Sequence, residues 1–221
     1  MPWLGGGGYK YFGLWIHGVQ YTKKDGGKVV GSLLVVLLES LADPIITGRE
    51  ELGMPKLFCD IEIDSATTEA TSIQCSWRGA PFLRMRLDGL GEIRGDQQQQ
   101  VDNGGRDDEA KTRPLAAPVN VDAGTMFYRY VPAVGKQGEA DAAYAVLVRD
   151  HDESSAVARQ VERVCHSQSS RLEFMEGDWT SFPTLHHVAA AFAEIPVYGI
   201  IEGKMEEGRG VDDLSHAERI E

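Results

Sequence analysis

Long hydrophobic runs are scarce in this sequence of 221 residues. The longest, Leu33–Leu38, falls far short of the about 20 apolar residues with which a helix spans a bilayer. The first residues, Met1–Leu4 followed by Gly5–Gly8, also lack the basic flank, apolar core and small-residue cleavage site of a secretory signal. The sequence therefore predicts a protein that is neither embedded in a membrane nor exported.

Cysteines and positively charged residues are also few. Cys59, Cys75 and Cys165 are odd in number and widely spaced, so the sequence predicts neither a disulfide framework nor paired metal ligands. This cysteine usage favours a reducing, cytoplasmic environment. Subtracting 34 acidic from 22 basic residues leaves a net charge of -12, which would repel a phosphate backbone. We therefore expect no nucleic-acid partner.

Metal-ligand patterns are missing as well. His186 and His187 are adjacent, and neighbouring side chains on a helix point about 100° apart, so they cannot bind one ion from the same face. The other histidines stand alone, without a His-x-Glu or Cys-x-x-Cys pattern. Gly5–Gly8 lacks the spaced lysine and following helix of a phosphate-binding loop. We expect no metal site.

What the sequence does contain is enough apolar material for a sizeable core, at 42% hydrophobic residues. Segments rich in Val, Ile, Tyr, Phe and Trp lie between glycines and prolines, which is typical of strands. The predicted strands are Tyr9–Tyr21, Lys28–Leu38, Leu57–Ile63, Thr71–Trp77, Phe82–Leu90, Thr125–Val131, Ala142–Arg149 and Val197–Ile201. The first two should form a hairpin around the turn Lys23–Gly27, with the second strand buried on both faces.

One helix is predicted near the end of the chain, where Thr180 or Ser181 can cap it and Pro196 ends it. Residues 96–113 are rich in Gln, Asp, Asn, Gly and Arg, and we interpret them as a mobile surface loop. Strand-like segments resume after this loop, so we expect one domain over residues 1–221. The charged tail after Gly208 should be frayed.

A lysine in the segment Asp43–Asp60 has an unusual setting. Lys56 is preceded by Met54-Pro55 and followed by Leu57-Phe58, and Pro55 fixes its own φ, so the lysine should enter the next strand at a defined angle. Burial among apolar groups penalises the ammonium form and favours the uncharged, nucleophilic amine. The alternative is a surface lysine whose amine reaches water over an apolar stem. Cys59 could be a second nucleophile, but a buried position on an alternating strand favours an inert thiol.

The sequence Gly48-Arg49-Glu50, then Glu51-Leu52-Gly53-Met54, then Pro55-Lys56 resembles the active-lysine segment of the acetoacetate decarboxylase family. In that family this lysine forms a Schiff base with the substrate. The resemblance implies a mainly β (α+β) fold, a barrel-like or cone-like antiparallel sheet with a few helices, and a homo-oligomer. It also implies a small β-keto acid as substrate and no cofactor. The residues inside the motif are most similar to those of fungal members, some of which act in polyketide toxin pathways.

Three departures from the family pattern accompany the resemblance. Family members carry a stretch before the point where this chain starts, including an arginine that lines the active site. Well-studied members have a second lysine directly after the nucleophile, whereas this chain has Leu57 at that position. A family glutamate follows a Tyr-Thr pair, whereas Tyr21-Thr22 is followed by Lys23. Activation of Lys56 should therefore come from desolvation.

The resemblance implies a lyase that decarboxylates acetoacetate or a longer, polyketide-derived β-keto acid. Lys56 would be the Schiff-base residue, Glu50 would orient it or relay a proton, and Arg49 would bind a carboxylate or hold Glu50. The residues expected to line the substrate site are Met54, Leu57 and Phe58. Two alternatives remain: aldol or dehydration chemistry through the same imine, and an inactive relative that binds a hydrophobic ligand.

Overall fold

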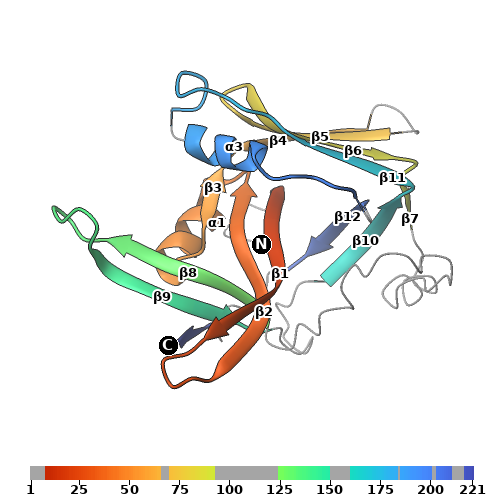
Figure 1. Cartoon of the computed structure of the whole chain (residues 1–221). Helices are drawn as coiled ribbons and strands as arrows, with labels where there is room; N and C mark the ends of the chain where they lie inside the picture. The colour runs from red at the N-terminus through yellow and green to blue at the C-terminus, as the bar shows by residue number, and fades with distance from the viewer. Residues whose placement is uncertain are drawn as a thin grey trace. The chain divides into compact units, whose positions relative to one another are not determined.

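A computed structural model describes residues 8–65, 70–92, 124–149, 160–183, 185–200, 203–210 and 217–221 (Figure 1). The predicted mobile loop at residues 96–113 lies outside these residues. The chain divides into two compact units. Unit 1 comprises Met1–Phe58, Lys111–Ala158 and Gly210–Glu221, and unit 2 comprises Cys59–Ala110 and Arg159–Arg209. That the chain forms one domain stays a prediction.

Unit 1 contains a 6-stranded sheet in the order β1-β2-β8-β9-β13, with β3 also paired to β2. Its strands are β1 (Tyr11–Thr22), β2 (Lys28–Glu39), β3 (Lys56–Phe58), β8 (Thr125–Pro132), β9 (Ala140–Val148) and β13 (Glu218–Ile220). The predicted hairpin is confirmed, because β1 and β2 pair antiparallel. Figure 1 shows this hairpin in red and orange and the β8–β9 hairpin in green.

The core of unit 1 explains why the sequence of β2 is a nearly continuous apolar run. Met126 on β8 and Ala145 on β9 belong to one cluster of buried side chains. The residues that follow them, Phe127 and Val146, belong to a second cluster. Since side chains alternate along a strand, the two clusters lie on opposite faces of the sheet. Strand β2 supplies both, through Val29 in one and residues such as Leu37 in the other.

A helical segment follows β2 that the sequence analysis did not predict. It consists of α1 (Ala42–Thr47) and a π-helical turn, η2 (Gly48–Leu52). Pro44 is tolerated because it lies in the first turn of α1, where its missing N–H has no intrahelical partner. Gly53 ends η2 with a φ of 74°, in the left-handed region that glycine adopts without a Cβ penalty.

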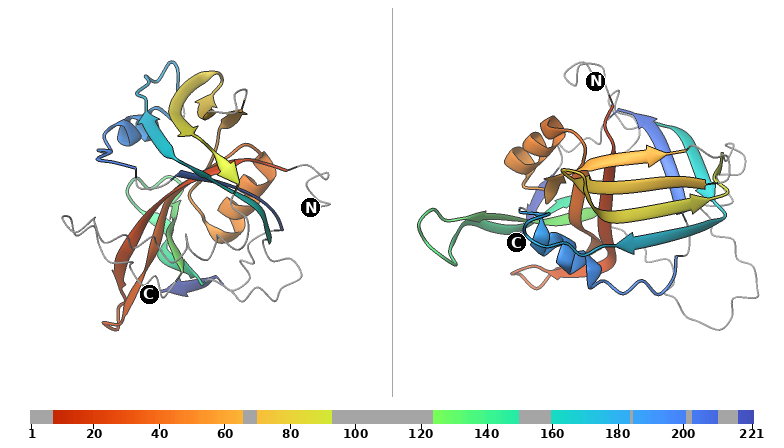
Figure 2. Two further views of the ribbon diagram at one scale, coloured as in Figure 1. Left: turned by 90° about the vertical axis from the view of Figure 1, so that its right-hand side faces the viewer. Right: turned by 90° about the horizontal axis from the view of Figure 1, so that it is seen from above.

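Unit 2 contains two further sheets and one helix. A 4-stranded sheet has the order β11-β6-β5-β4, and its strands lie side by side in the right-hand view of Figure 2. A 3-stranded sheet has the order β12-β10-β7. The elements of this unit are β4 (Asp60–Asp64), β5 (Ala70–Trp77), β6 (Ala80–Asp88), β7 (Gly91–Glu92), β10 (Gln160–Ser167), β11 (Ser169–Phe174), α3 (His186–Ala193) and β12 (Gly203–Arg209).

The predicted strand Leu57–Ile63 is wrong as a single element. Its first part belongs to β3, which pairs parallel with β2, and its second part is β4, which pairs antiparallel with β5. Cys59 lies between them with no exposed surface. The alternating apolar residues Leu57, Cys59 and Ile61 continue across the break between the two strands, so periodicity could not reveal the change of partner.

The predicted end of the chain also needs correction. Helix α3 begins at His186, because Thr180 and Ser181 instead donate their backbone N–H groups to Asp178 Oδ1 in a preceding turn. Residues 197–200 form no strand. At residues 218–220 the tail is not frayed, since β13 pairs with β9 and Ile220 is buried.

The structure confirms a mainly β fold with antiparallel sheets and helices. It adds parallel pairing, because β3 and β8 both run parallel to β2. None of the sheets formed by the described strands closes on itself. Within the same part of the chain, no helix is long and apolar enough to cross a membrane.

Candidate active site

Lys56 is the first residue of β3, and its backbone is held from two sides. Leu37 on β2 donates its N–H to the Pro55 carbonyl at 2.9 Å, and Lys56 is the partner of Leu37 in the parallel register. The Lys56 N–H donates to the Met54 carbonyl at 2.8 Å, which tightens the turn before the strand. The expected defined entry of Lys56 into its strand follows from these bonds and from the fixed φ of Pro55.

The amine of Lys56 lies inside unit 1, with only 7% of the residue exposed. Its Nζ donates to Glu39 Oε1 at 2.9 Å and to the Pro44 carbonyl at 3.1 Å. These acceptors come from the end of β2 and from α1, so the helical segment after β2 folds back over the lysine. The sequence around Lys56 indicates apolar neighbours, and the Glu39 carboxyl is a polar neighbour in addition.

Gly48 leaves the space that the lysine side chain occupies. A β-carbon placed on Gly48 would lie 2.5 Å from Lys56 Cε and 2.9 Å from Nζ, which is closer than real contacts allow. The φ of Gly48 is −66°, an ordinary helical value, so its backbone does not require glycine. The glycine that opens the Gly-Arg-Glu sequence therefore has a steric role against Lys56.

Glu39 is more deeply buried than the lysine, at 1% exposure. Desolvation raises the pKa of this carboxyl above its ordinary value, and the hydrogen bond and charge of Lys56 offset part of that effect. Its second oxygen, Oε2, has no hydrogen-bond partner among the described residues. A buried carboxyl with one free oxygen thus faces the amine.

Arg49 and Glu50, to which the resemblance gave supporting roles, both lie in η2. The Arg49 Nη1 donates to the backbone carbonyl of Lys56 at 2.9 Å. The Glu50 side chain is exposed, and its backbone carbonyl accepts from Arg129 Nη2 at 3.0 Å. The carboxylate seen at the amine is that of Glu39.

Met54, Leu57 and Phe58 surround the lysine in sequence but differ in burial. Met54 is partly buried and packs against the cluster that contains Leu37 and Phe127. Leu57 is also partly buried, whereas Phe58 is 39% exposed. The first of these side chains supports the core of unit 1, and the other two are accessible in part.

Two residues of this site were not predicted from the sequence. Glu39 ends the apolar run of β2, and a charged residue closing a buried strand was the available signal. Arg129 on β8 donates to the carbonyls of Glu50 and Glu51 and thereby holds the end of η2. Nothing in the sequence links Arg129 to the motif, because the two are brought together by the sheet.

Cys59 is not well suited to nucleophilic chemistry. Its thiol and that of Cys75 are both fully buried. A hydrogen bond with Cys75 and then burial raise the pKa of the Cys59 thiol far above its ordinary range. The reactive thiolate is therefore strongly disfavoured.

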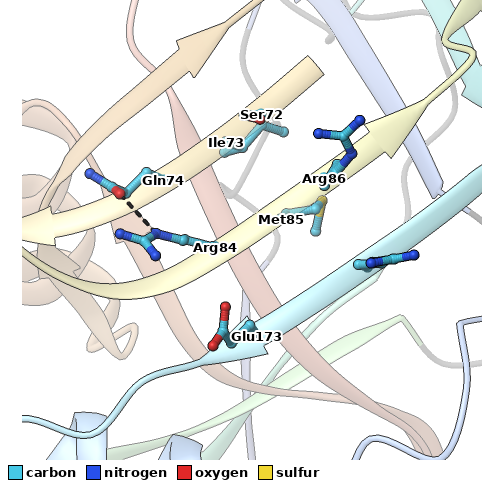
Figure 3. Close-up of a pocket in the computed structure, with 8 residues that line it drawn as sticks. Ser72, Ile73, Gln74, Arg84, Met85, Arg86 and Glu173 are labelled. Atoms are coloured by element: carbon cyan, nitrogen blue, oxygen red, sulfur yellow. Dashed lines mark hydrogen bonds between the residues drawn. The ribbon is translucent and has the colours of Figure 1, made fainter. Parts of the chain in front are cut away.

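Unit 2 contains a hollow of about 340 Å³ on its 4-stranded sheet (Figure 3). Its lining residues are Ser72, Ile73, Gln74, Arg84, Met85, Arg86, Arg171 and Glu173. Arg84 donates to Gln74 at 3.1 Å, and Arg86 forms an ion pair with Asp88 at 2.7 Å. None of the residues singled out from the sequence lines this hollow.

Comparisons with known proteins agree with the motif. A family model described as acetoacetate decarboxylase matches residues 1–215. No curated protein matches the sequence. The solved structure of an acetoacetate decarboxylase is 11% identical with a TM-score of 0.55, over 88% of this chain and 66% of its own length.

A second solved structure, the acetoacetate decarboxylase of Legionella pneumophila, is 12% identical with a TM-score of 0.52. The match covers 95% of this chain and 69% of that protein. This chain therefore spans roughly two thirds of both. At such low identity the likeness shows a shared fold.

Proposed function

Because the chain belongs to the acetoacetate decarboxylase family, we propose that it is an enzyme that decarboxylates a β-keto acid through a Schiff base on Lys56. The observation that carries this proposal is the burial of the lysine amine beside a buried carboxyl group. The substrate would be acetoacetate or a longer β-keto acid of the polyketide type. No cofactor is required, because the imine itself accepts the electron pair.

The surroundings of Nζ support a nucleophilic role. An uncharged amine has two N–H bonds and one lone pair. Glu39 Oε1 and the Pro44 carbonyl offer two acceptors, which satisfy both N–H bonds and leave the lone pair for a carbonyl carbon. Burial disfavours separated charges, and proton transfer from the ammonium to the Glu39 carboxyl, with the proton held on Oε2, would yield two neutral groups and leave Oε1 accepting from Nζ.

The reaction then follows in balanced steps. The Nζ lone pair forms a bond to the ketone carbon, and the carbonyl π pair moves to oxygen. The nitrogen passes one proton to that oxygen, solvent supplies a second proton, and loss of water leaves a protonated imine. The bond to the carboxylate breaks, its electron pair enters the imine to give an enamine, and CO₂ leaves. One proton is added to the enamine carbon, and hydrolysis releases the ketone and the amine.

Neighbouring residues receive supporting roles in this proposal. Arg49 holds the backbone of Lys56 through its bond to the carbonyl, and its remaining N–H groups can bind a substrate carboxylate. The exposed Glu50 carboxylate would relay protons with solvent. Leu57 and Phe58, with Met54 behind them, would contact the apolar part of the substrate. We also propose that the protein is a homo-oligomer in the cytoplasm.

A second candidate function keeps the same lysine and runs aldol or dehydration chemistry through the imine. The observation that favours it is Glu39, since a carboxylate beside an imine can remove a proton from the adjacent carbon. Both functions require an enamine. They differ in whether CO₂ is released.

Release of CO₂ from acetoacetate by the purified protein tests the proposal. Lys56→Arg keeps a cation for Glu39 but cannot form an imine, so its rate should fall to the uncatalysed level. Lys24→Arg, a matched change at an exposed lysine, should retain the wild-type rate. A Lys56→Arg rate within a few-fold of wild type would contradict the proposal. An adduct on Lys56 without CO₂ release would favour the second function.

A further inference from the structure

The two oxygens of the Glu39 carboxyl have different surroundings. Oε1 accepts from Lys56 Nζ at 2.9 Å, and Oε2 has no partner within the described part of the chain although the residue is 1% exposed. A buried carboxyl oxygen without a hydrogen bond is unfavourable, and such groups mark sites that a ligand or water completes. One oxygen therefore meets the amine, and the other is free for a group that arrives with the substrate.

The charge on Glu39 is controlled by Lys56. The elements around the end of β2 carry these titratable side chains: Tyr11, His17 and Tyr21 on β1, Asp43 on α1, Arg49, Glu50 and Glu51 on η2, and Lys56 on β3. The hydrogen bond and the charge that act on the Glu39 carboxyl come from Lys56. When Lys56 becomes a neutral enamine, that charge disappears and burial alone acts on Glu39. The protonated carboxyl then has no neighbouring cation, so it keeps the proton taken in the first step until the enamine carbon accepts it.

We infer that Glu39 is the acid–base residue of the site, accepting a proton from the Lys56 ammonium and later delivering one to the enamine carbon. The inference rests on the proposed function of Lys56. In the first step an N–H bond breaks, an O–H bond forms and the nitrogen lone pair is released. In the last, the Glu39 O–H bond breaks and a C–H bond forms as the enamine pair attacks the proton. Water supplies the proton that replaces CO₂.

The same assignment predicts a reaction that needs no decarboxylation. If Glu39 protonates the enamine carbon, it also removes a proton from that carbon in the imine of a simple ketone. In D₂O the protein should therefore exchange the α-hydrogens of acetone for deuterium, which proton NMR follows. Imine formation is measured separately, by borohydride reduction of the acetone adduct and mass spectrometry.

The Glu39→Gln variant should affect deuterium exchange and the trapping of acetone differently. The amide oxygen can still accept from Nζ, and loss of the negative charge favours the neutral amine, so trapping of acetone on Lys56 should persist. Deuterium exchange should fall by about 100-fold or more, as expected for a lost general base. Its pH profile should also lose the limb that reports the carboxyl. Glu51→Gln, an exposed glutamate in η2, should leave trapping and exchange unchanged.

The results of the exchange and trapping measurements can contradict the role of Glu39 in the following ways. Exchange by Glu39→Gln within about threefold of wild type, with trapping intact, would overturn the role of Glu39 and leave that of Lys56 standing. Failure to trap acetone on wild-type Lys56 would overturn both. If Glu39→Gln does not fold, Glu39→Asp, which keeps the charge but withdraws the carboxyl, must lower exchange more than trapping. Equal losses in both would contradict the inference.

Discussion

At the residue scale, the Lys56–Glu39 pair determines which substitutions are informative. Both side chains are almost fully buried, and removing one member of a buried ion pair leaves an uncompensated group at a cost of about 3–5 kcal/mol. Truncation of either residue to alanine would mix this loss of stability with any loss of chemistry. The polar substitutions Lys56→Arg and Glu39→Gln avoid most of that cost.

Gly48→Ala should displace the lysine without removing any polar group. The added methyl would lie 2.5 Å from Lys56 Cε, and a misplacement of the order of 1 Å can lower catalysis by about 100-fold. Steady-state CO₂ release measures the effect. Gly91→Ala is the matched control, because its β-carbon meets nothing within 4 Å. Equal rates for both variants would remove the steric role of Gly48.

The sequence pattern around Lys56 allowed two interpretations, a buried amine and a surface lysine with an apolar stem, and the resemblance to the active-lysine segment favoured the buried one. The partner of Lys56 could not be predicted. Glu39 lies 17 residues earlier, and its contact depends on the parallel pairing of Leu37 with Lys56. Such pairing between distant segments leaves no local pattern, so the carboxylate became visible only in the folded chain.

At the element scale, strands with strong local signals were predicted well and the helical segment was missed. The β1–β2 hairpin has apolar runs around an Asp-Gly turn, which is a local signal. Residues 42–52 contain Pro44 and Gly48, which ordinarily argue against a helix. Their presence has separate causes: Pro44 is in a first turn, and Gly48 gives space to Lys56.

Arg129 should stabilise η2 from the neighbouring strand. It donates to the carbonyls of Glu50 at 3.0 Å and Glu51 at 2.8 Å, groups that the end of a short helical turn leaves without intrahelical partners. Arg129→Met should lower the free energy of unfolding by about 1–3 kcal/mol, measured by urea denaturation. Because η2 carries Gly48 and Arg49, CO₂ release should fall as well.

Arg149→Met provides the comparison for Arg129→Met. Arg149 pairs with Glu218 at the surface, with about half of both side chains exposed, and such pairs contribute at most about 1 kcal/mol. It should change stability little and leave CO₂ release intact. If Arg129→Met had no larger effect than Arg149→Met, the support of η2 by β8 would be disproved.

At the scale of the whole molecule, unit 1 is assembled from chain segments that are far apart in sequence. Its sheet joins strands from the beginning, the middle and the end of the chain, including β13. Local sequence signals cannot specify such an arrangement, which explains why the tail was expected to fray. The family model matches residues 1–215 and ends before β13, so the placement of this strand comes from the folded chain.

Ile220→Ala tests whether the tail belongs to the core. Ile220 is 2% exposed and packs with Val29, Met126 and Leu147, so truncation should cost about 2–5 kcal/mol in urea unfolding. Ile16→Ala, at a residue that is 52% exposed, is the control and should cost less than half as much. Equal shifts for the two variants would mean that β13 contributes no core packing.

The most direct measurement is the position of the covalent adduct formed when borohydride reduces the protein in the presence of acetoacetate. Proteolysis and mass spectrometry should locate a reduced three-carbon acetone adduct on Lys56 and leave the other lysine peptides unmodified. A protein that releases CO₂ with no adduct, or with the adduct on another lysine, would contradict the account.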